Sequence, residues 1–171
     1  TIINIVDGEY GEGLEGPDYE TFLASGTDVL LDKPVEDESA PISINYTSGT
    51  TGNPKGVVYT HRSAYLNALD AMLEMGVNGR STYLWTLAMF HCNGWCFTWG
   101  VTAVGATHVC LRRLDPAEVF RLIADEHVSH MCGAPTVLIM LMSHPQAKTA
   151  VFPRKLHVTT AGAPPSPTVI A

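Results

Sequence analysis

The stretch with the strongest chemical character is TSGTTGNPKG, residues 47–56. It places four hydroxyl side chains, three glycines and one lysine within ten residues. The glycines allow positive φ angles and close approach of the backbone to a ligand. The hydroxyls supply neutral hydrogen-bond donors, and Lys55 supplies a positive charge. This combination predicts a phosphate-binding loop, although an exposed hairpin turn would use the same Asn-Pro dipeptide.

Two common phosphate-binding motifs do not match this loop. The nucleotide-triphosphatase P-loop places its lysine directly after a glycine, whereas here Pro54 precedes Lys55. The dinucleotide motif G-x-G-x-x-G also fails, because Thr51 stands two residues after Gly49. The following GVVYTH predicts a strand, so no helix N-terminus is expected to hold the anion. The expected design is a glycine-rich loop between the two arms of a hairpin.

A second candidate region, residues 81–111, contains no acidic or basic residue. Its polar interruptions leave apolar runs too short to cross a bilayer, so we expect no transmembrane segment. A zinc site from His91, Cys92, Cys96 and His108 is conceivable, but Cys-x3-Cys without a second close pair is a poor zinc signature. Buried free cysteines and a cytoplasmic compartment are the expectation.

Composition limits the class of protein. The 171 residues can bury a core, and 46% hydrophobic with 16% charged residues is typical of a globular domain. The net charge of −7 disfavours a nucleic-acid partner. The chain begins at Thr1 and ends at Ala171 shortly after a proline-rich turn. We therefore expect residues 1–171 to be a single partial domain from a longer protein.

Hydrophobic periodicity predicts strands that alternate with helices. Strands are expected at residues 1–6, 41–48, 56–61, 81–90, 107–112, 128–134 and 155–163. Helices are expected at residues 18–25, from Thr60 to beyond Leu73, and at 94–105, 115–127 and 135–144. This order predicts an α/β fold with a layered, largely parallel sheet and flanking helices. Ligand sites gather at the carboxyl ends of such strands, where we place loop 47–56 and turn 160–167.

Two of these helices carry finer expectations. The helix capped by Thr60 should bury an apolar stripe formed by Tyr65, Leu66, Leu69, Met72 and Leu73. The helix at 115–127 should begin with a capping box of Asp115 and Glu118, with Pro116 in its first turn. Its buried stripe should be Val119, Leu122 and Ile123.

Residues 46–57, YTSGTTGNPKGV, followed by Thr60 and His61, resemble the signature of the adenylate-forming, acyl-activating superfamily. MFHCNGWCFTWG, residues 89–100, is similar to the family's acyl-site strand and helix, particularly in medium-chain fatty acyl-CoA synthetases and plant acyl-activating enzymes. TTAGAPPS, residues 159–166, resembles the segment that lines the adenine and acyl pockets. The resemblance extends over nearly the whole chain from about Asp7. Ala88 departs from it, because relatives commonly have proline there.

The resemblance implies ATP-dependent activation of a medium-chain fatty or related acid to an acyl-adenylate and then an acyl-CoA thioester, with ATP, Mg²⁺ and coenzyme A. It implies that the ATP phosphates are held by Thr47, Ser48, Gly49, Thr50, Thr51, Gly52 and Lys55, with Thr47 also reaching magnesium and Lys55 serving catalysis. The acid would contact His91, Asn93, Trp95 and Gly162, with His91 beside the reacting carboxylate. Adenine and ribose would contact Gly162, Ala163 and Pro164. The alternatives are a satisfied histidine at a strand end for His91 and plain core for Trp95.

Two other functions stay open at this point. One is a nucleotide-binding or structural module without turnover, and the other is an adenylating enzyme that delivers to a carrier-protein thiol. The family's Tyr-Gly-x-Thr-Glu motif is not found, since Tyr10-Gly11 is followed by Glu12-Gly13. We expect this chain to be the central part of the family's N-terminal domain, without the C-terminal domain and inactive alone. The whole protein is expected to be a homo-oligomer.

Overall fold

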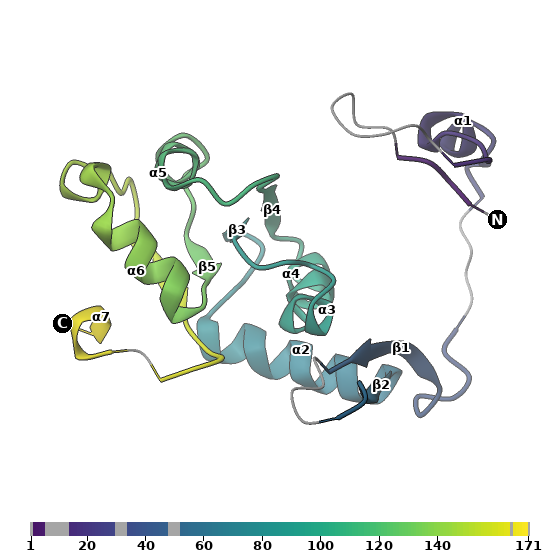
Figure 1. Ribbon diagram of the computed structural model, residues 1–171. Coiled ribbons are helices and arrows are strands. Elements are labelled where there is room, and N and C mark those ends of the chain that lie inside the picture. The colour runs from purple at the N-terminus through teal and green to yellow at the C-terminus, as the bar shows by residue number, and fades with distance from the viewer. Residues whose placement is uncertain (1, 6–13, 30–33, 48–51, 165, 171) are drawn as a thin grey trace. The chain divides into compact units, whose positions relative to one another are not determined.

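The computed structural model describes all residues except 1, 6–13, 30–33, 48–51, 165 and 171. The chain divides into two compact units, residues 1–35 and residues 36–171 (Figure 1). The single partial domain expected over residues 1–171 stays a prediction. Within the described residues, no helix has both the length and the apolar character needed to cross a membrane.

The first unit contains helix α1 (Tyr19–Ala24), as the sequence predicts. Asp18 caps it by accepting a 2.9 Å hydrogen bond from the Thr21 backbone N–H, and its bonds to Thr21 lower the Asp18 pKa. The strand predicted at residues 1–6 is wrong for its described part, which forms only an isolated bridge between Asn4 and Asp18. The Asn4 side chain instead binds backbone groups of Leu14 and Gly16.

The second unit begins with an antiparallel hairpin of β1 (Pro41–Tyr46) and β2 (Gly56–Thr60). Tyr46 pairs with Gly56, so loop 47–55 connects the two arms as predicted. In the described residues the hairpin is a two-stranded sheet of its own. Our placement of this loop at the carboxyl edge of the parallel sheet was therefore wrong.

The main sheet is parallel and, among the described residues, has the order β4-β3-β5-β6. Its strands are β3 (Thr82–Trp85), β4 (Thr107–Cys110), β5 (His130–Cys132) and β6 (His157–Thr159). Each is shorter than the run of residues predicted for it. The α/β class and the largely parallel sheet are confirmed.

Helices cover both faces of this sheet. Successive β3 side chains point to opposite sides, so neighbouring residues of β3 pack against different helices. Leu84 packs with residues of α5 (Pro116–Asp125) and α6 (Pro135–Ser143). Tyr83 and Trp85 pack with residues of α2 (His61–Met75) and α4 (Phe97–Ala103). The remaining helical segments are α3 (Cys92–Trp95), η1 (Pro145–Lys148) and α7 (Pro167–Ile170).

Helix α2 has its predicted start but not its predicted buried face. Thr60 caps it in a capping box with Ser63, and Gly76 ends it at φ 67°. The buried residues are Ala64, Ala68 and Met72, four positions apart. The other residues of the predicted stripe are exposed. Leu69 is 45% exposed and Leu73 is 74% exposed, and the values for Leu66 and Tyr65 lie within this range. Small side chains allow close packing against α4, where a Cβ on Gly100 would lie 2.8 Å from Met72 Cε.

Helix α5 buries the predicted stripe Val119, Leu122 and Ile123. Asp115 caps it, accepting from the N–H groups of Ala117 at 2.8 Å and Glu118 at 3.1 Å. The predicted capping box is wrong, because the Glu118 carboxylate accepts two hydrogen bonds from Arg121 instead. These bonds to Arg121 hold the Glu118 pKa below its ordinary value.

Candidate functional site

The two ends of the glycine-rich loop are held side by side by the hairpin. The Thr47 N–H donates to the Lys55 carbonyl at 2.9 Å, and the Lys55 N–H donates to Thr47 Oγ1 at 3.1 Å. Thr47, Gly52 and Lys55 are exposed, and within the described residues the Lys55 ammonium has no ion-pair partner. It is therefore accessible to an anionic ligand. The other predicted phosphate contacts, Ser48, Gly49, Thr50 and Thr51, lie outside the described residues.

Residues 92–96 form a left-handed turn, so the helix predicted from residue 94 is wrong at its start. Their φ angles are 49°, 44°, 59°, 54° and 64°, and the right-handed helix α4 begins only at Phe97. A left-handed conformation costs roughly 1–2 kcal/mol for most residues with a side chain; Gly94 avoids this cost, and asparagine, as at Asn93, tolerates the conformation better than other residues. Strain of this kind persists only where surrounding contacts impose it, and it clusters at functional sites.

Contacts from three directions hold this turn. The Asn93 side-chain Oδ1 accepts hydrogen bonds from Ser43 Oγ at 2.8 Å and from Asn45 Nδ2 at 2.7 Å, both on β1. The Asn93 carbonyl accepts from Thr98 Oγ1 at 3.0 Å. Gly94 lies against the Trp85 ring, where a Cβ would stand 2.6 Å from the ring carbon Cζ3. The hairpin, the sheet and α4 thus impose the left-handed conformation together.

His108 fixes Trp85 beneath the turn. The Trp85 indole N–H donates to His108 Nδ1 at 2.9 Å, and the two rings stack in parallel, 5.9 Å apart. Nδ1 is therefore an acceptor, which assigns the ring proton to Nε2, 3.0 Å from Thr102 Oγ1. Burial lowers the His108 pKa, which favours this neutral form. His108 is accounted for by this packing without a metal.

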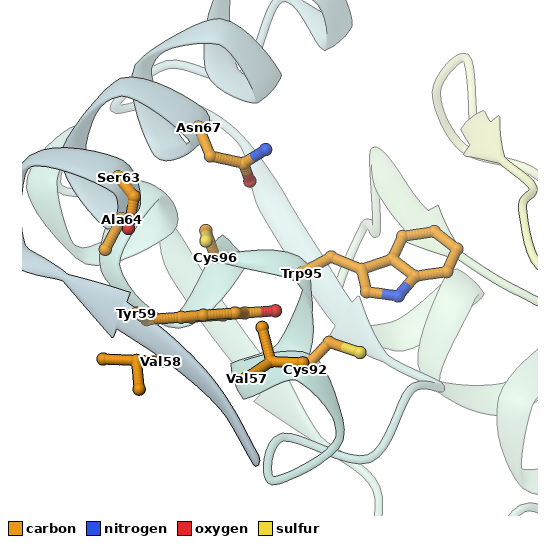
Figure 2. Close-up of a pocket in the computed structure, with 9 residues that line it drawn as sticks. All are labelled: Val57, Val58, Tyr59, Ser63, Ala64, Asn67, Cys92, Trp95 and Cys96. Atoms are coloured by element: carbon orange, nitrogen blue, oxygen red, sulfur yellow. The ribbon is translucent and has the colours of Figure 1, made fainter. Parts of the chain in front are cut away.

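A pocket of about 530 Å³ lies between the hairpin, α2 and the left-handed turn (Figure 2). None of its lining residues is acidic or basic: they are Val57, Val58, Tyr59, Ser63, Ala64, Asn67, Cys92, Trp95 and Cys96. Figure 2 shows Tyr59 crossing the pocket with its hydroxyl toward the turn. Burial, with Cys92 and Cys96 nearby, raises the Tyr59 pKa, and burial likewise raises the Cys96 pKa. The pocket is therefore uncharged at neutral pH and suits an apolar group.

The predicted acyl-side residues have three different surroundings. Trp95 is half-buried and lines the pocket. His91 is exposed and is not among the lining residues, and its carbonyl accepts from the Gly94 N–H at 2.9 Å. The amide oxygen of Asn93 is used by β1. Their roles toward a substrate stay predictions.

Sequence reasoning missed Tyr59 and Asn67 as lining residues. Alternation along β2 could not have indicated Tyr59, because the consecutive residues Val57, Val58 and Tyr59 all line the pocket. Nothing in the sequence of α2 singled out Asn67, since its place depends on how the hairpin packs on the helix.

The predicted adenine turn follows β6 directly. The Gly133 N–H donates to the Thr159 carbonyl at 2.9 Å, and Thr86 Oγ1 donates to the Cys132 carbonyl, so the carboxyl ends of β3, β5 and β6 are tied together. Gly162 has φ 90°, and a Cβ there would meet no protein atom within 4 Å. The positive φ angle, and not crowding by other protein atoms, explains why glycine occupies this position. Ala163 and Pro164 are exposed, as a ligand-contacting turn requires.

Comparisons with known proteins agree on one family. The sequence profile described as "AMP-binding enzyme" matches residues 7–171. The chain is 47% identical over 163 residues to acetate–CoA ligase CCL3 of Humulus lupulus, covering 95% of this chain and 29% of that protein. It is 46% identical over 154 residues to the peroxisomal acetate/butyrate–CoA ligase AAE7 of Arabidopsis thaliana, covering 90% of this chain and 27% of that protein. The chain thus spans less than a third of the length of these relatives.

Solved structures show the same fold. The inhibitor-bound N-terminal domain of FACL13 from Mycobacterium tuberculosis superposes with a TM-score of 0.80 at 30% identity, over 88% of this chain and 38% of that one. The o-succinylbenzoate coenzyme A synthetase MenE of Bacillus subtilis, in complex with ATP and magnesium, superposes with a TM-score of 0.70 at 26% identity, over 78% and 28% of the chains. Because the family profile matches nearly the whole chain, this chain belongs to the AMP-binding enzyme family.

Proposed function

We propose that the protein containing this chain activates a carboxylic acid with ATP and transfers it to coenzyme A. A carboxylate oxygen attacks the α-phosphorus, pyrophosphate leaves, and an acyl-adenylate results. The coenzyme A thiol then attacks the acyl carbon, and AMP leaves. The observation that carries this proposal is an exposed, lysine-bearing loop end on the same hairpin that walls an uncharged pocket. CoA ligases among the relatives support it.

The chain's own groups bind and orient the reactants in this proposal. Lys55 pairs with the ATP phosphates, and exposed backbone around Gly52 lies within their reach. This reaction needs no nucleophile from the protein. The two buried thiols agree with that, because burial raises the pKa of Cys96 and raises the pKa of Cys132 to about 11. Both therefore stay protonated at neutral pH. Catalysis then rests on positioning and charge stabilisation.

Magnesium would bind together with the ATP phosphates and would neutralise part of their charge. Within the described part of the chain, no three His, Cys, Asp or Glu side chains gather in a way that could hold a metal ion. Thr47 offers one exposed hydroxyl oxygen, a hard ligand of the kind magnesium accepts. We therefore propose Thr47 as the one contribution of the described residues to that ion.

The pocket supports a fatty or related acid as the substrate class. Its lining offers no acidic side chain to pair with the amino group of an amino acid, and its volume of about 530 Å³ is within the range of small-molecule pockets. Trp95 forms part of its wall. The acid's carboxylate would then lie toward His91, whose exposed position leaves it free to approach a ligand.

The acyl acceptor, the compartment and the oligomeric state are further parts of this proposal. Coenzyme A is favoured over a carrier-protein thiol by the names of the relatives. A cytoplasmic location fits the free cysteines of the described chain. We also propose that the whole protein is a homo-oligomer.

The test uses the full-length protein with ATP, magnesium and a panel of acids from acetate to dodecanoate, with and without coenzyme A. Mass spectrometry should detect AMP, with an acyl-CoA formed only when coenzyme A is present. Alanine and phenylalanine serve as amino-acid controls and should not react. Binding of ATP with no product from any acid would support a non-catalytic module. An adenylate that never reaches coenzyme A would support a carrier-protein acceptor.

A further inference from the structure

Side-chain hydrogen bonds join the left-handed turn at residues 92–96 to strand β1 of the hairpin. Asn93 Oδ1 accepts from Ser43 Oγ at 2.8 Å and from Asn45 Nδ2 at 2.7 Å. All three side chains are partly buried, and the donors precede Asn93 by 50 and 48 residues. We call this pair of hydrogen bonds the Asn93 latch.

The polarity of β1 is reversed in a way that the latch explains. Ser43 and Asn45 lie two residues apart, so they share one face of the strand, and that face is the partly buried one. Ile44 and Tyr46 point to the other face and are exposed. A strand with one solvated face normally turns its polar residues toward water. Here they turn toward Asn93, which gives them hydrogen-bond partners away from solvent.

The latch lies midway between the two halves of the candidate site. Asn45 precedes Thr47 by two residues and pairs across the hairpin with Val57, which follows Lys55 by two residues. Asn93 is two residues from both His91 and Trp95. The hydrogen bonds therefore connect the phosphate-loop ends to the acyl-side turn by a short route.

We infer that Asn93 is a positioning residue whose latch holds the acyl-side turn in register with the phosphate loop and couples the binding of ATP to that of the acid. This inference rests on the proposed function. Three of the turn's five residues, Cys92, Trp95 and Cys96, have side chains that disfavour a left-handed backbone, so the turn relaxes when the latch is removed. Adenylation needs the carboxylate in line with the α-phosphorus, and misplacement by about 1 Å can cost about a hundredfold in rate.

Four variants of the full-length enzyme separate the latch from general stability. Asn93→Gly removes the acceptor and tolerates φ 44° without steric strain, and the donor variant below removes the same hydrogen bonds without changing the backbone of the turn. Asn93→Asp keeps oxygen acceptors for both donors. Ser43→Ala with Asn45→Ala removes the donors. Asn78→Gly is the control for loss of an asparagine side chain, because within the described residues Asn78 bonds inside its own turn, to Gly76, Arg80 and Ser81.

The readout is acid-dependent ATP–pyrophosphate exchange. For Asn93→Gly we expect kcat to fall about ten- to a hundredfold while KM for ATP changes less than about threefold. Asn93→Asp should stay within about threefold of the wild type, and Asn78→Gly should match it. Adding Asn93→Gly to the donor variant should cause no further loss, because both remove the same interaction. An unchanged kcat in Asn93→Gly, no rescue by Asp, or losses that multiply would overturn the inference.

Hydrogen exchange distinguishes failure of this inference from failure of the proposed function. ATP with magnesium should slow exchange of the backbone amides at residues 91–96 in the wild type but not in Asn93→Gly. If ATP gives this latch-dependent protection but no acid reacts, the adenylation proposal falls and the coupling stands. If acids react and the protection is absent, or equal in both proteins, the coupling is wrong and the proposed function stands.

Discussion

Among single residues, Lys55 provides the positive charge at the glycine-rich loop 47–56, which we propose to bind the ATP phosphates. It has no ion-pair partner among the described residues, so its replacement should leave the fold intact. We expect Lys55→Ala to lower kcat/KM for ATP about ten- to a hundredfold, because a hydrogen bond to a charged group contributes roughly 1.5–3 kcal/mol. Steady-state kinetics in the full-length enzyme measure this. Lys148→Ala, an exposed lysine on η1, is the control. Equal kinetics for both variants would remove Lys55 from the site.

Substitutions of Trp95 test two properties: its place in the pocket wall and the cost of its left-handed backbone. Trp95→Ala and Trp95→Gly should both shift preference toward longer or bulkier acids and leave KM for ATP nearly unchanged. The glycine variant should be more stable by about 1–2 kcal/mol, since Trp95 has φ 54° and alanine pays the left-handed cost there. Acid-series kinetics and urea unfolding give the two readouts. A large loss of stability with unchanged preference would instead make Trp95 plain core.

At the scale of elements, Gly94 tests whether the left-handed turn is packed as described. Gly94→Ala brings a Cβ to 2.6 Å from the Trp85 ring at φ 59°, whereas Gly76→Ala at φ 67° meets nothing within 4 Å. We expect Gly76→Ala to cost about 1–2 kcal/mol for conformation alone. Gly94→Ala should cost about 2–5 kcal/mol, because overpacking adds about 1–3 kcal/mol. Equal costs in urea unfolding would contradict the packing of the turn on β3.

The contact between β3, β4 and α4 predicts a dependence of stability on pH. Burial lowers the His108 pKa, so the folded state holds the neutral ring while the unfolded state binds a proton near the ordinary value of about 6.5. Stability from this group is complete above that value and is lost as the pH falls from it toward the lowered folded pKa. In His108→Gln, the free energy of unfolding should fall less between pH 7.5 and pH 5 than it does in the wild type. The same pH dependence of the free energy of unfolding in both proteins would contradict the lowered His108 pKa.

Local patterns in the sequence predict many elements but not the turn that shapes the site. The capped helix α5 and the hairpin follow from cap residues and alternation, which are properties of neighbouring residues. The left-handed turn depends on Ser43 and Asn45, almost fifty residues away, and MFHCNGW alone reads as a strand followed by a helix. The predicted buried stripe of α2 is wrong for a related reason. Ala64 and Ala68 are buried because their small side chains allow the helix to pack closely, and not because they are large and hydrophobic. Tertiary contacts override local propensity in both cases.

At the scale of the whole molecule, the exposed face of α2 predicts association of the isolated chain. Leu66, Leu69 and Leu73 place apolar side chains on one helix, each at least 45% exposed. We expect residues 1–171, expressed alone, to self-associate with rising concentration in sedimentation experiments. Leu69→Lys with Leu73→Lys should reduce association, whereas Leu14→Lys, an exposed leucine of the first unit, should not. A monomer at all concentrations would contradict this expectation.

The central claim is that a carboxylate oxygen attacks the α-phosphorus of ATP, and isotope transfer tests it most directly. The full-length enzyme is given butyrate labelled with ¹⁸O in both carboxylate oxygens, together with ATP, magnesium and coenzyme A. We expect each AMP released to carry one ¹⁸O atom, because the carboxylate oxygen that attacked phosphorus stays with AMP when the thiol displaces it. Label in inorganic phosphate with ADP as the nucleotide product, or unlabelled AMP alongside butyryl-CoA, would contradict it.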